Sequence, residues 1–183
     1  MASLTVRRRR VVGWMMGLAA GAFGLSFGVP ALALKALTLD RPVIGSGDTL
    51  VYADSASGAQ PGQPFKASDL APGAAAQVFP LGKTTNQDNL VQVVRLAPGS
   101  GVDGLVAYSA ICTHLGCAVF AKLTPERLIL CPCHGSQYDP ANGAAVRRGP
   151  ADRALPGLPI ADGPNGGVVV SGPFSGPIGP QSA

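Results

Sequence analysis

The sequence contains little cysteine and histidine, with four cysteines and two histidines among 183 residues. All six lie between Cys112 and His134. Structural cysteines of a core and histidines of a surface would be scattered along the chain, so this clustering excludes them as an explanation. The six side chains therefore indicate one chemical site.

Charged residues are also scarce, at 13% of the chain. The formal net charge is +4, but it comes from four consecutive arginines, Arg7 to Arg10. Outside this run, basic and acidic residues are equal in number, so no extended basic surface is available to neutralise phosphates. The charge distribution therefore excludes a nucleic-acid-binding protein.

The composition favours a single β domain with accessory segments. Hydrophobic residues make up 46% of the chain, which excludes a disordered protein. The 25 glycines and 17 prolines are too many for a helical bundle and favour a loop-rich fold. Short apolar runs separated by Gly and Pro turns predict an all-β, antiparallel sandwich or barrel-like domain. The expected strands lie at residues 75–81, 90–96, 104–110, 118–121, 127–130 and 167–171.

Residues 11–34 form an uncharged, apolar stretch directly after the arginines. As a helix they would reach roughly 36 Å, more than the roughly 30 Å of a bilayer core, so they can form a transmembrane anchor. A cleaved signal peptide is the alternative, because Ala31-Leu32-Ala33 matches a cleavage site. The stretch exceeds the apolar region of about 7–15 residues of a signal peptide, which favours one N-terminal transmembrane helix.

The basic residues predict how this helix is oriented. Residues 1–10 are expected in the cytoplasm, since the arginines precede the span and only Lys35 directly follows it. The sequence Arg8-Arg9-Arg10-Val11-Val12 also resembles the twin-arginine signal, which exports folded proteins. Everything after the span is therefore expected outside the cytoplasm.

Three segments follow in the predicted organisation. Residues 35–64 are the expected connector, with a possible short strand at 49–52 and a flexible, Gly- and Pro-rich tether near its end. Residues 65–172 are the expected folded domain. Residues 173–183 form a Pro- and Gly-rich tail without regular structure.

Two short segments hold all six candidate ligands, C-T-H-L-G-C at residues 112–117 and C-P-C-H-G-S-Q-Y at residues 131–138. Each follows an apolar run and is expected to leave a strand as a loop. Three kinds of site are open: zinc bound by Cys2His2 or Cys3His, two plain disulfides, or an iron–sulfur cluster with mixed ligands. Zinc leaves two cysteines unused and disulfides leave both histidines unused, whereas a cluster with one bridge uses all six.

The two segments resemble the cluster-binding loops of Rieske iron–sulfur proteins. The resemblance implies a [2Fe–2S] cofactor, with cysteines on one iron and histidines on the other. The implied metal ligands are Cys112, His114, Cys131 and His134. It also implies a disulfide between Cys117 and Cys133, which agrees with an oxidising compartment outside the cytoplasm. The implied fold is a Rieske-type antiparallel β-sandwich with a small cluster-binding subdomain.

Residues beside the ligands match further positions of the family. Ser136 and Tyr138 match hydroxyl groups that bond to the cluster or its ligands in high-potential members and raise the potential. Alone they would be an ordinary turn hydroxyl and a core aromatic. The resemblance further implies that Leu115 and a proline loop, Gly149-Pro150-Ala151, shield the cluster.

Among Rieske proteins, an anchor, a tether, a disulfide and the Ser–Tyr pair are typical of quinol-oxidising cytochrome bc complexes. The resemblance implies an oxidoreductase subunit in which His134, with His114 beside it, faces membrane quinol and the electron passes to a c-type cytochrome. Its implied partners are cytochrome b and c-type cytochrome subunits and the bilayer, with the domain on the periplasmic side of a bacterial cytoplasmic membrane. One alternative is the Rieske small subunit of an arsenite oxidase-type enzyme. Another is a structural binding module stabilised by zinc or disulfides.

Overall fold

The computed structural model of the protein describes residues 42–53 and 59–181. The expected cytoplasmic N-terminus, the transmembrane helix at 11–34 and the beginning of the connector lie outside the described residues. Within the described part, no helix is long and apolar enough to cross a bilayer. The described residues all belong to one compact unit, which begins at Pro42.

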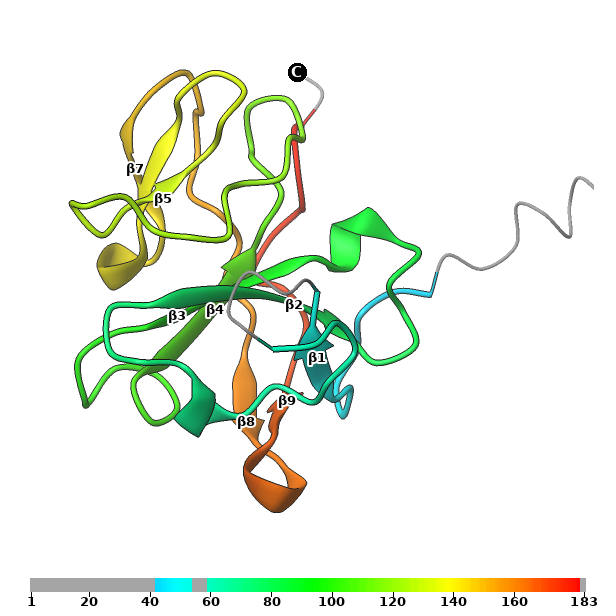
Figure 1. Cartoon of the computed structure of the whole chain (residues 1–183). Coiled ribbons are helices and arrows are strands. Elements are labelled where there is room, and N and C mark those ends of the chain that lie inside the picture. Colours follow the sequence, from blue (N-terminus) through cyan, green and yellow to red (C-terminus); the bar gives the residue numbers. More distant parts are fainter. Residues whose placement is uncertain (1–41, 54–58, 182–183) are drawn as a thin grey trace, which may run out of the picture. The chain divides into compact units, whose positions relative to one another are not determined.

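A four-stranded antiparallel sheet forms the base of this unit (Figure 1). Its strands, in spatial order, are β1 (Leu50–Tyr52), β2 (Ala75–Pro80), β3 (Val91–Arg95) and β4 (Leu105–Ser109). β2 alternates half-buried and buried residues, the period-two pattern of a strand with one face on a core. The valine-rich β3 is buried at four of its five positions, as expected for a central strand covered on both faces.

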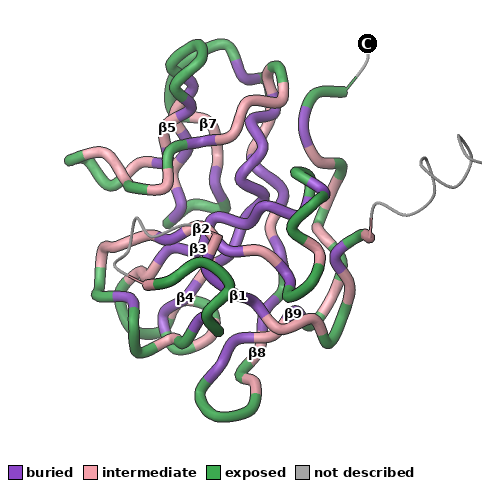
Figure 2. Tube along the Cα trace, turned by 45° about the vertical axis from the view of Figure 1, so that its right-hand side comes forward, coloured by how far each residue is buried: buried purple, intermediate pink, exposed green. Residues whose placement is uncertain are grey.

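A hairpin of β8 (Ile160–Asp162) and β9 (Val168–Val170) forms the second layer. Single bridges join Thr49 to Val169 and Lys66 to Gly167, and so connect the hairpin to the segments around β1. Side chains of both layers meet in a hydrophobic core, within the buried interior that Figure 2 shows in purple. Its fully buried members include Leu50, Phe65, Val78, Val91, Val93, Leu105 and Val168. The predicted antiparallel, mostly β architecture is confirmed.

Between β4 and β8 the chain forms a small subdomain, drawn above the four-stranded sheet in Figure 1. Its antiparallel sheet contains β5 (Ile129–Leu130), β6 (Gln137–Asp139) and β7 (Ala145–Arg148), with β6 in the centre. A second hydrophobic core holds this subdomain together, and Cys112 and Cys131 are among its buried members. Short 3-10 turns complete the fold: η1 (Ala67–Asp69), η2 (Gln87–Asn89), η3 (Pro140–Asn142) and η4 (Pro164–Gly166).

Five of the six expected strands are confirmed as β2, β3, β4, β5 and β9, with ends that differ by at most two residues. The strand expected at 118–121 is wrong, since this segment forms only a single bridge, between Ile111 and Ala118. The Val119 N–H donates to Ala110 at 2.8 Å, whereas the Phe120 N–H donates to Leu130 at 2.8 Å. Consecutive residues thus bond to two different neighbours, the end of β4 and β5, and no continuous ladder develops.

The described part of the expected connector is built into the domain. The strand considered at 49–52 is present as β1, with Leu50 and Val51 buried. The Phe65 N–H donates to the Leu50 carbonyl at 2.9 Å, which fixes the end of the connector onto this strand. The folded region therefore starts before residue 65 and includes the strand expected at 49–52.

Candidate metal centre

The first candidate loop, residues 112–117, follows β4 and closes on itself. The Cys112 N–H donates to the Cys117 carbonyl at 2.8 Å, and the Gly116 N–H donates to the Cys112 carbonyl at 3.0 Å. Gly116 has a φ of +78°, which glycine adopts without the steric cost of a side chain. The closed turn directs the backbone N–H groups of His114 and Leu115 at the Cys112 sulfur.

The second candidate loop begins at Cys131, directly after β5, and repeats this backbone arrangement. The Cys131 N–H donates to the Ser136 carbonyl at 2.8 Å, and the Gly135 N–H donates to the Cys131 carbonyl at 3.1 Å. Gly135 has a φ of +74°, and the N–H groups of Cys133 and His134 are directed at the Cys131 sulfur. Each loop therefore holds one buried sulfur that accepts hydrogen bonds from two backbone N–H groups, and such bonds by themselves favour the thiolate form.

A disulfide links the two loops. Cys117 and Cys133 are joined with an S–S distance of 2.04 Å and a Cα–Cα distance of 6.5 Å. The Sγ atoms of Cys117, Cys133 and Cys131 all lie within 4.8 Å of one another, so the bridge lies directly against the second free thiol. Cys112 and Cys131 remain as free, buried cysteines.

The two histidines come together at the same place from different loops. The rings of His114 and His134 meet edge to face, with 4.7 Å between their centroids and an interplanar angle of 90°. The Nδ1 atom of His114 is buried and has no hydrogen-bond partner among the described residues. A buried, unpaired nitrogen is costly, and a metal bond to its lone pair removes that cost. His134 and Leu115 are exposed, so one side of the loop pair faces solvent.

The environment of Cys112 favours its ionised form. Burial by itself raises the pKa of the Cys112 thiol, but hydrogen bonds from the Tyr138 hydroxyl and the backbone outweigh burial and lower the pKa overall. The Tyr138 oxygen lies 3.1 Å from Cys112 Sγ. Burial, and then this same contact, raise the pKa of Tyr138, so its hydroxyl keeps its proton and donates it to the sulfur. Burial also raises the pKa of Cys131, so the two thiols differ.

The proline loop packs directly onto the second candidate loop. The Ala151 N–H donates to Ser136 Oγ at 3.2 Å, and Ser136 is fully buried. A Cβ on Gly149 would lie 2.5 Å from Ser136 Cα, closer than any real Cβ contact, so only glycine fits there. Gly149 and Pro150 are exposed, whereas Ala151 is buried. Residues 149–151 thus pack against Ser136 of the second candidate loop.

Thr113, which the sequence pattern did not single out, also belongs to this site. It is buried, its N–H donates to the Tyr138 oxygen at 3.3 Å, and its Oγ1 donates to the Arg153 carbonyl at 2.7 Å. Its signal in the sequence is its place in the segment C-T-H-L-G-C, between two expected ligands. Nothing in the sequence pattern marks Arg153 as part of this site.

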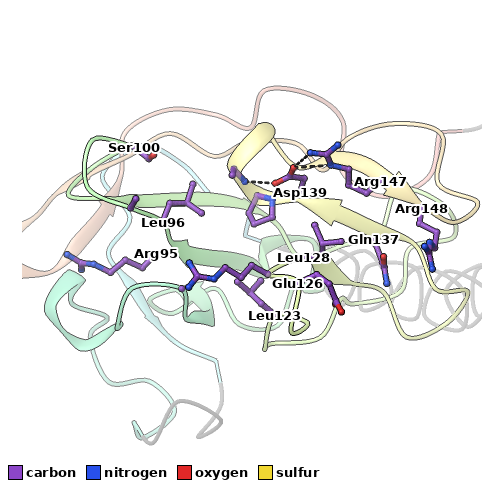
Figure 3. Close-up of a pocket in the computed structure, with 15 residues that line it drawn as sticks. Arg95, Leu96, Ser100, Leu123, Glu126, Leu128, Gln137, Asp139, Arg147 and Arg148 are labelled. Carbon is purple, nitrogen blue, oxygen red and sulfur yellow. Dashed lines mark hydrogen bonds and ion pairs between the residues drawn. The ribbon is translucent and has the colours of Figure 1, made fainter.

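A cavity of about 600 Å³ lies elsewhere, and none of the six cysteines and histidines lines it (Figure 3). Arg147 and Arg148 line it, and the Arg147 Nε donates to Asp139 Oδ2 at 3.0 Å across its edge. Both arginines are exposed, as expected for solvated side chains beside the proline loop. The paired loops therefore lie outside this cavity.

A family model described as the Rieske [2Fe-2S] domain matches residues 64–159. The chain belongs to the Rieske [2Fe–2S] family. The match includes both candidate loops and the proline loop, and the cofactor of this Rieske domain is a [2Fe–2S] cluster. The two free thiols and the unpaired His114 nitrogen fit that group. The zinc-stabilised and disulfide-only binding modules are set aside.

Relatives of this Rieske chain belong to respiratory complexes. The cytochrome bc1 complex Rieske iron–sulfur subunit of Streptomyces lividans is 36% identical over 135 residues, which cover 64% of this chain and 79% of that protein. A Rieske subunit of Haloferax mediterranei, named for a respiratory nitrate reductase, is 47% identical over 79 residues. That match covers 43% of this chain and only 35% of the Haloferax protein. Among solved structures, the soluble domain of Rieske protein II from Sulfolobus acidocaldarius is 28% identical, with a TM-score of 0.39, and the match covers 50% of this chain and 48% of that one.

Proposed function

We propose that this chain is the Rieske subunit of a quinol-oxidising cytochrome bc complex, which takes electrons from membrane quinol and passes them to a c-type cytochrome. The observation that carries the proposal is the hydrogen bond of 3.1 Å between Tyr138 and Cys112 Sγ. A donor to a ligand sulfur stabilises the reduced, more negative cluster and raises its potential, as quinol oxidation requires. The similarity to the Streptomyces lividans bc1 subunit supports the same function.

Four side chains of the two loops hold the cluster in this proposal. Cys112 and Cys131 bind one iron, and His114 and His134 bind the other. When bound, the [2Fe–2S] group would supply one-electron redox chemistry. The buried, free thiols and the unpaired Nδ1 of His114 support this assignment. The disulfide between the loops keeps the two halves of the ligand set together.

The exposed side of the loop pair receives the quinol. An imidazole that binds a metal through one nitrogen can accept a hydrogen bond from a quinol hydroxyl at its other nitrogen. His134, which is exposed, holds the quinol proton in this role, with His114 beside it. Leu115, with 62% of its surface exposed, offers an apolar contact next to these rings, and with residues 149–151 it excludes water from the cluster.

The membrane arrangement is part of the same proposal. Residues 11–34 anchor the chain in a bacterial cytoplasmic membrane, and the Rieske domain lies on the periplasmic side, next to cytochrome b and c-type cytochrome subunits. The disulfide between Cys117 and Cys133 supports this side of the membrane, because disulfides persist in oxidising compartments.

Removing either hydroxyl group near the cluster should lower its potential. A hydrogen bond to a charged group contributes about 1.5–3 kcal/mol, so Ser136→Ala and Tyr138→Phe should each lower the midpoint by roughly 65–130 mV. An EPR-monitored redox titration of the full chain measures the shift. Tyr108→Phe is the matched control, because the Tyr108 hydroxyl is in the same core but donates to the Pro140 carbonyl at 2.8 Å. Unchanged midpoints in both test variants would refute the tuning role.

The assembly itself can be tested by purification of the tagged full chain from membranes. Co-purified b- and c-type haem, together with quinol-dependent reduction of cytochrome c, are the expected results. The relative from Haloferax mediterranei makes a nitrate reductase the second candidate, so nitrate reductase activity in the same preparation would favour that function instead.

A further inference from the structure

Residues 172–181, here called the C-terminal strap, run along the domain without regular secondary structure. Its Ser175 makes a reciprocal pair of hydrogen bonds with Gly157, each of 2.8 Å. Phe174 packs against the first hydrophobic core and Ile178 against the second, so the strap connects the base of the molecule to the cluster subdomain. Figure 1 shows this red segment running beside the green chain that follows β4.

The strap ends against the first cluster loop. A Cβ on Gly116 would lie 3.4 Å from the Pro180 ring, and a Cβ on Gly179 would lie 3.4 Å from the Ile111 side chain. Gly179 is buried, although the strap is otherwise mostly on the surface. The position of the strap is therefore coupled by direct contact to residues 111–116.

One arginine holds this end of the strap. The half-buried guanidinium of Arg153 donates through Nη1 to the Pro177 carbonyl at 2.9 Å and through Nη2 to the Gly179 carbonyl. The planar, forked geometry of a guanidinium suits two carbonyls two residues apart, and a lysine could not reproduce it. Arg153 thus binds the strap at two points.

The main chain of the same residue binds the first loop. The Arg153 carbonyl can only accept, so the hydroxyl hydrogen of Thr113 is directed to it, at 2.7 Å. The Thr113 N–H in turn donates to the Tyr138 oxygen at 3.3 Å, and the Tyr138 oxygen lies 3.1 Å from Cys112 Sγ. Hydrogen bonds made by Arg153, Thr113 and Tyr138 therefore connect the strap to Cys112 Sγ.

We propose that Arg153 is a positioning residue, which clamps the C-terminal strap with its side chain and Thr113 with its carbonyl, and thereby holds the Tyr138 hydroxyl at Cys112 Sγ. The proposal rests on the proposed function, because it assigns Tyr138 a role in setting the potential. When the clamp is lost, the first loop is free to move and the hydrogen bond to Cys112 lengthens. The cluster then accepts an electron less readily.

The test compares Arg153→Met, which keeps the stem and removes the donors, with Arg148→Met, an exposed arginine at the end of β7. In cluster-loaded full chain at a fixed potential, Arg153→Met should reduce the ratio of reduced to oxidised cluster by about threefold to tenfold, where tenfold corresponds to 59 mV for one electron. Chymotrypsin should also cleave the strap at Phe174 faster. Arg148→Met should change neither quantity.

A double-mutant cycle separates this inference from the function on which it rests. In a Tyr138→Phe background, Arg153→Met should produce no further shift, because the bond it supports is already gone. An unchanged potential in Arg153→Met, or an equal shift in both backgrounds, would overturn the inference. Tyr138→Phe alone reports on the proposed tuning. If Arg153→Met does not retain its cluster, Arg153→Lys, which cannot reproduce the two bonds to the strap, replaces it in the cycle with the same expected outcomes.

Discussion

Replacing His134 by alanine should yield a folded chain that contains almost no iron. In the proposed ligand set, His134 supplies one of only two imidazoles, and the sequence holds no other histidine that could replace it. Even the loss of a partner behind a ligand lowers metal affinity by about 10–100-fold, so the loss of a ligand itself should lower it further. Iron and acid-labile sulfide per chain, together with the EPR spectrum of the reduced protein, measure the effect.

The fold should survive this change because nothing in either hydrophobic core depends on His134, which is exposed. The disulfide between Cys117 and Cys133 still closes the loops. Leu115→Ala is the matched control, since it removes an exposed side chain of the same site without touching a ligand. It should keep full iron content and slow only quinol oxidation. Full iron and an unaltered spectrum in His134→Ala would show that the ligand set is wrong.

The sequence predicted both candidate loops, and their glycines explain why. Both loops place a glycine four residues after the first cysteine, Gly116 after Cys112 and Gly135 after Cys131. In each loop that glycine donates back to the cysteine carbonyl with a positive φ. Such short-range closure is encoded locally, so the pattern of residue types was sufficient to predict two equivalent loops.

Strands whose partners are distant were harder to predict. β6 begins with Gln137 and ends with Asp139, and β7 ends in two exposed arginines, so neither shows an apolar run. They exist because Tyr138 is buried in the second core and pairs with Val146 across the sheet. Residues 118–121 show the opposite case, an apolar run that forms no strand. Its backbone N–H groups donate to two different segments of the chain. Tertiary contacts determine the structure of β6, β7 and residues 118–121, and a local sequence pattern does not indicate such contacts.

The two hydrogen bonds from Arg153 to the strap could not be predicted from the sequence, because they too depend on tertiary contacts. Its partners Pro177 and Gly179 lie in a segment whose composition indicated only a tail. Their carbonyls are main-chain groups, which every residue type offers equally. A contact of this kind appears only when the two segments are seen side by side in space.

Replacing Gly149 by alanine should destabilise the cluster subdomain as a whole. Gly149 has a φ of +95°, and an alanine there carries a conformational cost of about 1–2 kcal/mol. Its Cβ would also lie 2.5 Å from Ser136 Cα and 2.7 Å from Ser136 N, both backbone atoms of the second loop. Overpacking of this kind costs about 1–3 kcal/mol, since a loop and not a flexible side chain must move. The apparent melting temperature of the cluster-loaded chain should fall by about 10 °C.

A control variant at a second glycine separates the conformational cost of a positive φ from the steric overlap with Ser136. Gly166, between β8 and β9, has a φ of +74° and open space around the position of a Cβ. Gly166→Ala should therefore carry only the conformational cost and lower the melting temperature by about 2–8 °C, with no change at the cluster. In Gly149→Ala the displaced Ser136 also loses its bond from the Ala151 N–H, so the midpoint potential should fall together with the stability. Equal effects of the two variants on stability, with an unchanged potential in both, would mean that the proline loop does not support the second cluster loop.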